Sequence, residues 1–451
     1  MKDMLLSVCL VGDSHVVAEA TNDVHLIRCE RRLQREGTSC PTLAGKAVTH
    51  GDHERIARHF QTKLPAVAGG LSGSHRRETY RTVGRRSYRR VRAPRHADAS
   101  GDVCSVRRVG ERVLTLRELN RATLARQLLL ERKRLSPTAV IERLVGMQAQ
   151  WPPAPYLGIW TRTTSFRREA LERELAKGAV VKATVIRQTL HLLTRRDYAL
   201  LRAALSETNF PWEASQAKLL APSVRALAAA GPVTTEEALA HLEREHGLTG
   251  VNARRAWRGA RVRAHLLHHH ETALWHTRRE GRFVALEEPE PHDPLEARAE
   301  ILRRYFAAFG PASRRDIVAW SMMHVPEIGR ALNRLEPLRR FRDEQGRELL
   351  DVPRAPLPDA DTPARVRFLP KWDNVLLAFA DRTRVLPEQY RKRVIRMNGD
   401  VAQTFLVDGF VAGIWSVEDG RVVLAPFAPL SLSVRREVED EAGRLEAFLA
   451  D

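Results

Sequence analysis

The amino-acid sequence predicts an α+β fold of three tandem winged-helix units followed by a C-terminal β-rich module. First, helical segments followed by a two-stranded ribbon occur three times after residue 112, as in winged-helix proteins. Second, the three copies share this order without strict sequence repetition. Third, a linker rich in proline and aspartate, Pro353–Pro363, precedes β-branched runs separated by Asp-Gly turns. The predicted domains are residues 1–112, 113–198, 199–293, 294–353 and 364–451.

Residues 1–112 are predicted to be a disordered basic extension. The stretch from His75 to Arg95 is rich in arginine among small polar residues, a composition that rarely forms a packed core. Two interpretations stay open: a basic arm that binds nucleic acid, or sequence upstream of the native start. The cysteines of the chain fall in this segment without the CxxC spacing of zinc or redox sites, at Cys9, Cys29, Cys40 and Cys104.

The first unit begins near Val113, where apolar residues start to recur at helical spacing. Either Thr115 or Asn120 can cap its first helix, which runs through Leu130. Ser136 is an N-cap residue followed by proline at the first helical position, which predicts a second helix. The elements expected next are this helix over 138–147, a third helix over 167–177 and a ribbon over 180–193.

The second and third units are predicted from the same signals. Thr234 followed by two glutamates is typical of an N-cap and the first turn of a helix. The second unit is expected to have helices over 238–245 and 252–268 and a ribbon over 273–286. The third is expected to have helices over 294–308, 313–321 and 326–336 and ribbon strands over 338–341 and 348–352.

The C-terminal module is predicted from its turns. Asp408-Gly409 and Asp419-Gly420 each lie between β-branched or aromatic runs, which predicts two hairpins. An amphipathic pattern over 433–449 predicts a final helix.

The composition is strongly basic. The 451 residues include 74 Lys+Arg against 55 Asp+Glu, a formal net charge of +19. This excess favours a polyanionic partner such as nucleic acid, although an arginine-rich genome would produce part of it. No apolar run approaches the ~20 residues of a membrane-spanning helix. We therefore expect a monomer in the cytoplasm, associated with DNA and not with a membrane.

Gln148-Ala149-Gln150, followed by Trp151 and two prolines, is the most informative motif. We expect it to close the helix that starts after Ser136, with the prolines stopping that helix. Residues two apart do not share a face of a regular helix, but at an unwinding helix end both amides can reach one cleft. Glutamine amides bind a base edge, a sugar or a water and cannot act as a general base. Alternatively, both amides only cap the helix end and bind loop carbonyls.

Several motifs together are similar to one protein family. They are Leu119–Gln127, Gln148–Gln150, Arg187–His191, Leu369–Asn374 and Asp381-Arg382. On these motifs the chain from about residue 113 onward resembles the bacterial winged helix DNA-binding domain family. That family includes the alkylpurine and crosslink-unhooking DNA glycosylases of azinomycin self-resistance. The resemblance implies a C-shaped molecule around a basic cleft that holds double-stranded DNA, and it implies no cofactor.

The resemblance also implies an activity. In the glycosylase branch the catalytic element is glutamine, a spacer and glutamine, which implies catalytic roles for Gln148 and Gln150. A sister branch has aspartate in the third place, and Ala149 is smaller than the usual spacer. The implied enzyme is a monofunctional glycosylase for N7- or N3-alkylated purines, including crosslinked ones. Such a base leaves as a neutral molecule, so catalysis needs only a positioned water and dipoles that face the sugar cation at C1′.

Other candidate residues have a functional and a structural interpretation. His191 would line the cleft, or else is a buried structural histidine. Asp373 would aid the glutamines, or else fixes a turn or pairs with Arg382 or Arg384. Trp151 is either core or a platform that stacks on a base. Phosphate contacts, or else a solvated face, are expected of Lys371, Arg382, Arg384, Arg391, Lys392 and Arg393.

His268, His269 and His270 are consecutive histidines at a predicted helix end. Consecutive side chains on a helix point in different directions, which argues against a shared metal ion. We therefore expect no metal site.

The main alternative function is a non-enzymatic winged-helix DNA-binding protein, such as a transcriptional regulator. Regulators usually dimerise on a palindromic site with one winged helix per subunit. Three units in one chain and a glutamine pair favour the glycosylase. A weaker alternative is an RNA-binding or chromatin-associated protein selected only for charge.

Overall fold

The computed structural model describes residues 7–11, 14–21, 24–29, 111–205, 211–277, 281–286 and 292–451. The chain separates into two compact units, residues 1–103 and 104–451. In the first unit an antiparallel sheet is formed by β1 (Ser7–Val11), β2 (Ser14–Thr21) and β3 (Val24–Cys29). The β-branched residues of these strands favour extended backbone. That residues 1–112 form a disordered basic extension stays a prediction. The arginine-rich stretch from His75 to Arg95 lies outside the described residues.

Residues 113–194 confirm the predicted caps and ribbon but not the predicted end of the second helix. Thr115 caps the first helix through a reciprocal hydrogen bond with Glu118. The second helix ends at Arg143 because Val145 and Gly146 have φ values of 56° and 89°. The elements are β4 (Val113–Leu114), α2 (Leu116–Arg126), α3 (Pro137–Arg143), β5 (Met147–Gln148), α4 (Pro153–Trp160), α5 (Arg168–Ala176), β6 (Val180–Thr184), η1 (Ile186–Gln188) and β7 (Leu190–Thr194).

The prolines after Trp151 act differently from the prediction. Pro153 is the first residue of α4, a helix that the sequence analysis did not predict. Proline is favoured at this position because its fixed φ suits a helix and its missing N–H would be unpaired there. The Pro-Pro pair therefore starts a helix instead of stopping one.

Residues 195–286 are mainly helical. Thr234 caps its helix through Glu237, as predicted. The ribbon strands are β9 (Leu266–His268) and β10 (Arg282–Ala285), so the predicted ribbon over 273–286 is wrong in its first strand. His265, with φ of 57°, ends α9 and lets the chain continue directly as β9. The elements are α6 (Arg195–Leu205), α7 (Pro211–Ala229), β8 (Val233–Thr234), α8 (Thr235–His246), α9 (Gly250–Arg263), β9 (Leu266–His268), η2 (His270–Ala273) and β10 (Arg282–Ala285).

Residues 292–351 confirm the predicted helices and ribbon. Asp293 caps the long helix of this segment, and Ser313 caps the next one together with Asp316. The last two strands pair antiparallel, as predicted. The elements are α10 (Pro294–Phe309), α11 (Arg314–Ser321), α12 (Val325–Arg334), β11 (Arg339–Asp343) and β12 (Glu348–Asp351).

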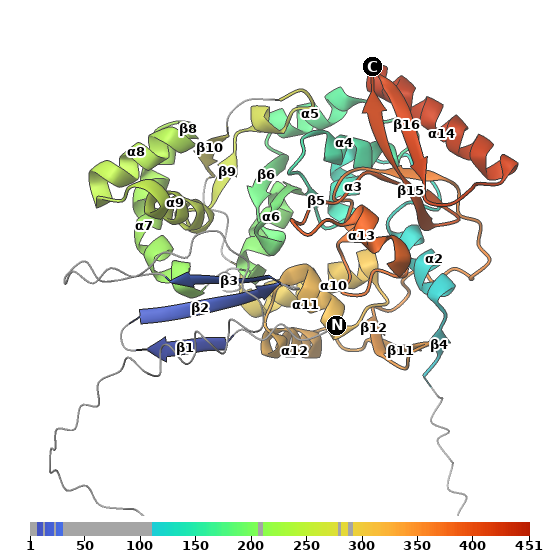
Figure 1. Cartoon of the computed structure of the whole chain (residues 1–451), viewed down its shortest axis with the longest axis horizontal. Helices are drawn as coiled ribbons and strands as arrows, with labels where there is room; N and C mark the ends of the chain where they lie inside the picture. The colour runs from blue at the N-terminus through green and yellow to red at the C-terminus, as the bar shows by residue number, and fades with distance from the viewer. Residues whose placement is uncertain are drawn as a thin grey trace, which may run out of the picture. The chain divides into compact units, whose positions relative to one another are not determined.

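The C-terminal module is β-rich, as predicted. Both Asp-Gly turns connect antiparallel strands, and α14 packs beside the last of them (Figure 1). The first strand of its sheet was not predicted from the sequence. The elements are β13 (Arg367–Leu369), η3 (Asn374–Leu376), η4 (Glu388–Tyr390), α13 (Arg391–Val394), β14 (Thr404–Val407), β15 (Phe410–Glu418), β16 (Arg421–Pro426) and α14 (Leu432–Ala450).

The fold is a mixed α+β structure with several small sheets. One six-stranded sheet has the order β5-β7-β6-β9-β10-β8 and so crosses the predicted boundary at residue 198. Its two halves meet where Lys182 of β6 pairs with His268 of β9, and the Lys182 ammonium donates to the Thr272 carbonyl at 2.8 Å. None of the helices in the described part of the chain is long and apolar enough to cross a membrane.

The hydrophobic cores join segments that are distant in the sequence. One core contains Leu144 and Met147 from the first predicted unit together with Phe405 and Leu445 from the C-terminal module. The first predicted unit and the C-terminal module therefore bury their apolar side chains against each other, and the segment around β5 rests on both.

A buried ion pair ties α2 to β12. Both oxygens of Asp351 accept hydrogen bonds from Arg126, at 2.8 and 2.9 Å, and both side chains are fully buried. The Arg126 guanidinium also donates to the carbonyls of Phe306 and Pro356. The backbone of Gly310 lies close to this ion pair. A Cβ at this position would be 2.6 Å from the Asp351 carboxylate, which explains why the residue is a glycine.

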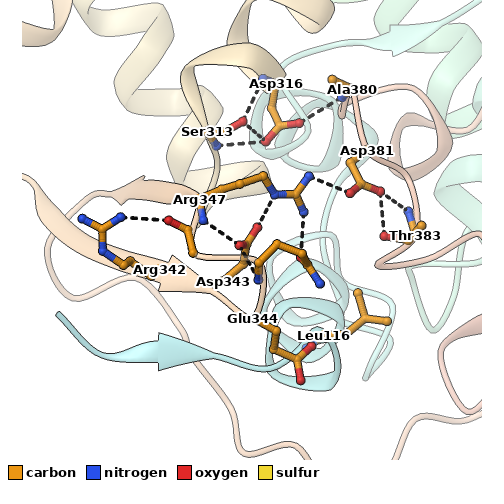
Figure 2. Close-up of polar contacts among 12 residues, drawn as sticks. Leu116, Ser313, Asp316, Arg342, Asp343, Glu344, Arg347, Ala380, Asp381 and Thr383 are labelled. Carbon is orange, nitrogen blue, oxygen red and sulfur yellow. Dashed lines mark hydrogen bonds and ion pairs between the residues drawn. The ribbon is translucent and has the colours of Figure 1, made fainter. Parts of the chain in front are cut away.

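The β11–β12 turn is held against the C-terminal module by a second set of charges (Figure 2). Arg347 binds Asp343 on its own hairpin and Asp381 in the C-terminal module, the latter at 2.8 Å. Asp381 in turn accepts hydrogen bonds from Thr383, while Asp316 of α11 accepts one from the Ala380 amide. These contacts fix residues 380–383, which follow the loop that carries several candidate site residues.

Replacing Asp351 with alanine would leave the Arg126 guanidinium buried without its carboxylate. We expect the free energy of unfolding to fall by about 3–5 kcal/mol. Glu348→Ala on the same strand is the matched control, because it removes an exposed pair with Arg340 and should cost less than about 1 kcal/mol. Urea denaturation followed by tryptophan fluorescence measures both, and equal losses would contradict the expectation.

Candidate active site

Gln148 and Gln150 lie on a short extended segment and not at a helix end. β5 pairs antiparallel with β7 so that Gln148 lies opposite His191. Ala149 continues the pairing by donating its amide hydrogen to the Leu190 carbonyl at 2.7 Å. Alternate side chains of an extended segment point to the same side, which brings the glutamines together and directs Ala149 into the core. The two amides do converge, but the cause is a strand and not an unwinding helix.

The glutamine amides are hydrogen-bonded to each other and to an arginine. Nε2 of Gln148 donates to Oε1 of Gln150, and Oε1 of Gln148 accepts from a guanidinium nitrogen of Arg187 at 3.0 Å. Gln148 is 6% exposed, whereas Gln150 is exposed. The series Arg187–Gln148–Gln150 therefore leads from a cation inside the protein to an amide that faces solvent.

Arg187 reaches the pair through an unusual backbone conformation. Within η1, φ is 51° for Arg187 and 55° for Gln188. Such values cost of order 1 kcal/mol or more at each non-glycine residue. The Trp320 carbonyl also accepts a hydrogen bond from the guanidinium, at 3.2 Å. Burial, and secondly the charge of Arg382, lower the pKa of Arg187 to about 10, so the side chain is charged at neutral pH.

His191 is buried beside this series and is 3% exposed. Its Nδ1 lies 2.9 Å from the carbonyl oxygen of Thr189, so Nδ1 carries the hydrogen of a neutral ring. Burial, followed by the charge of Arg187, lowers the pKa of His191 to about 3. His191 lines a small hollow together with Arg187 and Asn374. The ring is therefore neutral at physiological pH and supplies no proton there.

Asp373 is fully engaged within the protein. Its two oxygens accept hydrogen bonds from Arg162 at 2.8 and 2.9 Å, and both side chains are buried. Asp373 also accepts from the Val375 amide, which caps η3. The turn-fixing interpretation is confirmed, but the partner is Arg162 and neither Arg382 nor Arg384. Because both oxygens are occupied, we do not assign Asp373 a direct role beside the glutamines.

Asn374 connects this ion pair to the glutamine segment. Its Nδ2 donates to the carbonyls of Leu144 and Gly146, at 3.1 and 2.7 Å. Gly146 has φ of 89°, and a Cβ there would lie 2.3 Å from the Leu193 side chain. The turn that leads into β5 is thus fixed from the C-terminal module by one amide.

The remaining candidates fall into different environments. Trp151 is half-buried against the core, which supports the core interpretation. Lys371 pairs with Asp400 at 3.0 Å. Arg382 is half-buried and donates to the Leu376 carbonyl. Arg384 is 6% exposed, binds the Pro311 carbonyl and stacks on a phenylalanine ring, so it is not available for the expected phosphate contact.

The cations of α13 are exposed. Arg391, Lys392 and Arg393 all have exposed side chains, and the Arg393 guanidinium lies 4.0 Å from the centroid of the Phe427 ring. Burial, followed by the charge of Arg391, lowers the pKa of Arg382, so the two guanidinium groups are near enough to repel each other.

The consecutive histidines differ from the prediction. They do not lie at the end of an α-helix. His268 is the last residue of β9, and the chain then enters η2. The rings of His269 and His270 lie 4.4 Å apart, and ligand atoms of both and of Glu271 lie within 4.8 Å of one another. The geometric reason for expecting no metal there is therefore wrong, although the absence of a bound metal stays the expectation.

Sequence reasoning did not single out three residues that shape the site. Arg187 and Asn374 were part of the motifs that carried the family resemblance, but no role followed from their spacing. Arg162 had no signal, because its partner Asp373 is distant in the sequence and the pairing is visible only in the structure.

Comparison with known proteins identifies the family of the region that contains these residues. The family model "DNA glycosylase AlkZ-like" matches residues 141–448. An interstrand DNA cross-link repair glycosylase of Streptomyces sahachiroi is 24% identical over 363 residues, which cover 71% of this chain and 92% of that protein. The solved structure of the Streptomyces sahachiroi DNA glycosylase AlkZ is similar with a TM-score of 0.64 and 21% identity, covering 75% of this chain and 97% of that one. The glutamine segment, the arginine beside it and the module that holds them all lie in the matched region, and the chain belongs to the AlkZ-like DNA glycosylase family.

Proposed function

We propose that this protein is a monofunctional DNA glycosylase that excises purines alkylated at N7 or N3, including purines that form interstrand crosslinks. The observation that carries the proposal is the hydrogen-bonded series Arg187–Gln148–Gln150, with its last amide exposed. Family membership and the crosslink-repair activity in the relative's name support it. Damaged double-stranded DNA inside the cell would then be the partner, bound by a monomer without a cofactor.

The two glutamines have different roles in this proposal. Gln150 faces solvent, so its amide contacts the attacking water and the sugar of the damaged nucleotide. Gln148 is buried and bonded on both sides, so it orients Gln150. Arg187 fixes the Gln148 carbonyl and contributes positive charge near the DNA phosphates. Preorganised dipoles of this kind need no reorientation when positive charge develops at C1′.

The substrate follows from the weakness of these groups. Neither glutamine can remove a proton, and a pKa of about 3 makes His191 a very weak base. Such a site can release only a base that leaves readily, and alkylation at N7 or N3 gives the base a positive charge that makes it leave as a neutral molecule. Water then attacks C1′, and its proton passes to solvent through the exposed side of the site. Undamaged purines would not be substrates.

The architecture that we propose consists of winged-helix units over 113–198, 199–293 and 294–353 and a C-terminal module over 364–451, arranged in a C shape around a basic cleft. The order of helices and ribbons in each segment supports it. A cleft that encircles duplex DNA suits a crosslinked base, which resists full extrusion from the helix. A non-enzymatic regulator would account for the charge but not for the Gln148–Gln150 arrangement.

Gln150→Ala should slow the release of 7-methylguanine from methylated duplex DNA by about 100-fold or more, because the water and the sugar lose their dipole. Gln148→Ala should slow base release by a similar factor, because the Gln150 side chain would lose the hydrogen bond that orients it. Single-turnover assays with the full chain and excess enzyme measure the rate, and affinity for undamaged duplex should change little.

Gln345→Ala, an exposed glutamine in the β11–β12 turn, serves as the matched control and should leave the rate unchanged. Wild-type rates in both single variants would contradict the proposed roles.

The rate of base release should be nearly constant between pH 5 and 8. The pKa of His191 is about 3, so its protonation does not change in that range, and glutamines do not titrate. A general base with an ordinary histidine pKa would instead slow the reaction about tenfold per pH unit below that pKa. Single-turnover rates at saturating enzyme across this range distinguish the two cases, and a sigmoidal profile would exclude the base-free mechanism.

A further inference from the structure

One apolar side chain stands fully exposed at the tip of a tight turn. Met397 is 100% exposed, the highest value among the large apolar side chains that the structure describes as exposed. The turn spans Arg396–Asp400, where the Arg396 amide donates to the Asp400 carbonyl at 2.9 Å. Gly399, with φ of 81°, closes it by donating to the Arg396 carbonyl at 3.0 Å. The backbone therefore directs Met397 away from the protein.

The turn is anchored to the rest of the module. The Trp372 indole donates to the Gly399 carbonyl at 3.0 Å, and Lys371 binds both oxygens of Asp400. The Lys371 ammonium also lies 5.1 Å from the centroid of the Trp372 ring. These contacts hold the turn in place, so Met397 is presented to solvent on a fixed backbone.

The anchor leads to the glutamine pair. Trp372 is followed directly by Asp373 and Asn374, and Asn374 holds the Gly146 carbonyl at 2.7 Å. Few covalent and hydrogen-bonded steps therefore separate the Met397 turn from β5.

The surroundings of Met397 are cationic. The exposed residues of α13 and of the turn that follows it are Arg391, Lys392, Arg393 and Arg396. The carboxylates closest to them are Glu388 and Asp400, each 3.8 Å from an arginine. A protein partner for an exposed methionine would need an apolar rim, whereas cations around one apolar tip fit phosphates around a base stack.

We propose that Met397 is a wedge that enters duplex DNA between two stacked bases beside the damaged nucleotide, while the cations of α13 bind the flanking phosphates. The inference rests on the proposed function and extends it to how the damaged base is reached. Apolar side chains inserted between base pairs unstack them and kink the helix. Methionine suits this role because it is unbranched and flexible, with a polarisable sulfur. A local kink would open the glycosidic bond to Gln150 without full extrusion of the base.

The test uses the full chain and a duplex with a single 7-methylguanine on a 2′-fluorinated sugar, which slows hydrolysis and preserves the complex. 2-Aminopurine at successive positions around the lesion reports unstacking by increased fluorescence. We expect a rise at one step beside the lesion for wild type and for Met397→Leu, and no rise for Met397→Ala. Leu432→Ala, which truncates another exposed side chain (77%), is the matched control and should behave as wild type.

The rate of base release from an unfluorinated duplex should fall about tenfold or more in Met397→Ala. Without the methionine side chain, no contact with the separated bases offsets the energetic cost of unstacking them. Release from single-stranded DNA, which needs no wedge, should be unchanged. A fluorescence rise in Met397→Ala equal to that of wild type would overturn the proposal.

The fluorescence test is independent of catalysis. The variant with both Gln148→Ala and Gln150→Ala should release no base and still unstack the duplex. If wild type released no base, the proposed function would fail while the fluorescence would still decide on the wedge. If wild type released base without a fluorescence rise at any step, the wedge alone would fail.

The phosphate contacts have their own measurement. Lys392→Gln should reduce the slope of log affinity against log salt by about one, since each phosphate contact releases about one counterion. Met397→Ala should leave this slope unchanged, because the wedge carries no charge. An unchanged slope in Lys392→Gln would overturn the placement of α13 on the DNA backbone.

Discussion

The candidate site depends on the buried ion pair between Arg162 and Asp373. Arg162 follows α4 and, besides Asp373, binds the carbonyls of Gln127 and Gly158, each at 2.9 Å. Two charges in a protein interior are tolerated only when they are paired and their remaining hydrogen-bonding groups are satisfied. Because Asp373 is fixed, its neighbour Asn374 is fixed as well and holds the turn before β5. The geometry of the glutamines thus depends on a residue of a module more than two hundred positions later in the chain.

The basic residues of the chain include two groups, arginines buried inside the protein and cations exposed on its surface. The largest fully buried side chains include Arg121, Arg126 and Arg162, whose guanidinium groups bind carbonyls and carboxylates inside the protein. A guanidinium presents its donors in a rigid planar fork, which suits such internal contacts. These arginines add to the net charge of +19 without reaching a ligand. The charge that is available to DNA is therefore better judged from exposed groups such as those of α13 than from the total.

Local signals in the sequence predicted most elements correctly. Thr115, Ser136, Thr234 and Ser313 all cap helices, and the Asp-Gly turns connect strands. Errors arose where the tertiary structure overrode a local pattern. The apolar run before Gln148 has helical spacing, yet it leaves the helix at Arg143 because β7 offers a strand edge with which Gln148 pairs. The sequence analysis missed α4 because it interpreted the two prolines as the end of a helix, and it missed α6 because that helix continues directly from β7. It also missed α7.

The sequence by itself determined the α+β class, the caps and turns, and the motif that marks the family, because each depends on residues within one or two turns of the chain. It also indicated that Gln148 and Gln150 converge. Only the tertiary structure decided how they converge, which arginine fixes them and that Asp373 is committed to Arg162. Those contacts join residues far apart in the chain, such as Gln148 with Arg187 and Asn374 with Gly146. Their partners are selected by burial and by the pairing of polar groups in the folded interior, which spacing along the sequence does not encode.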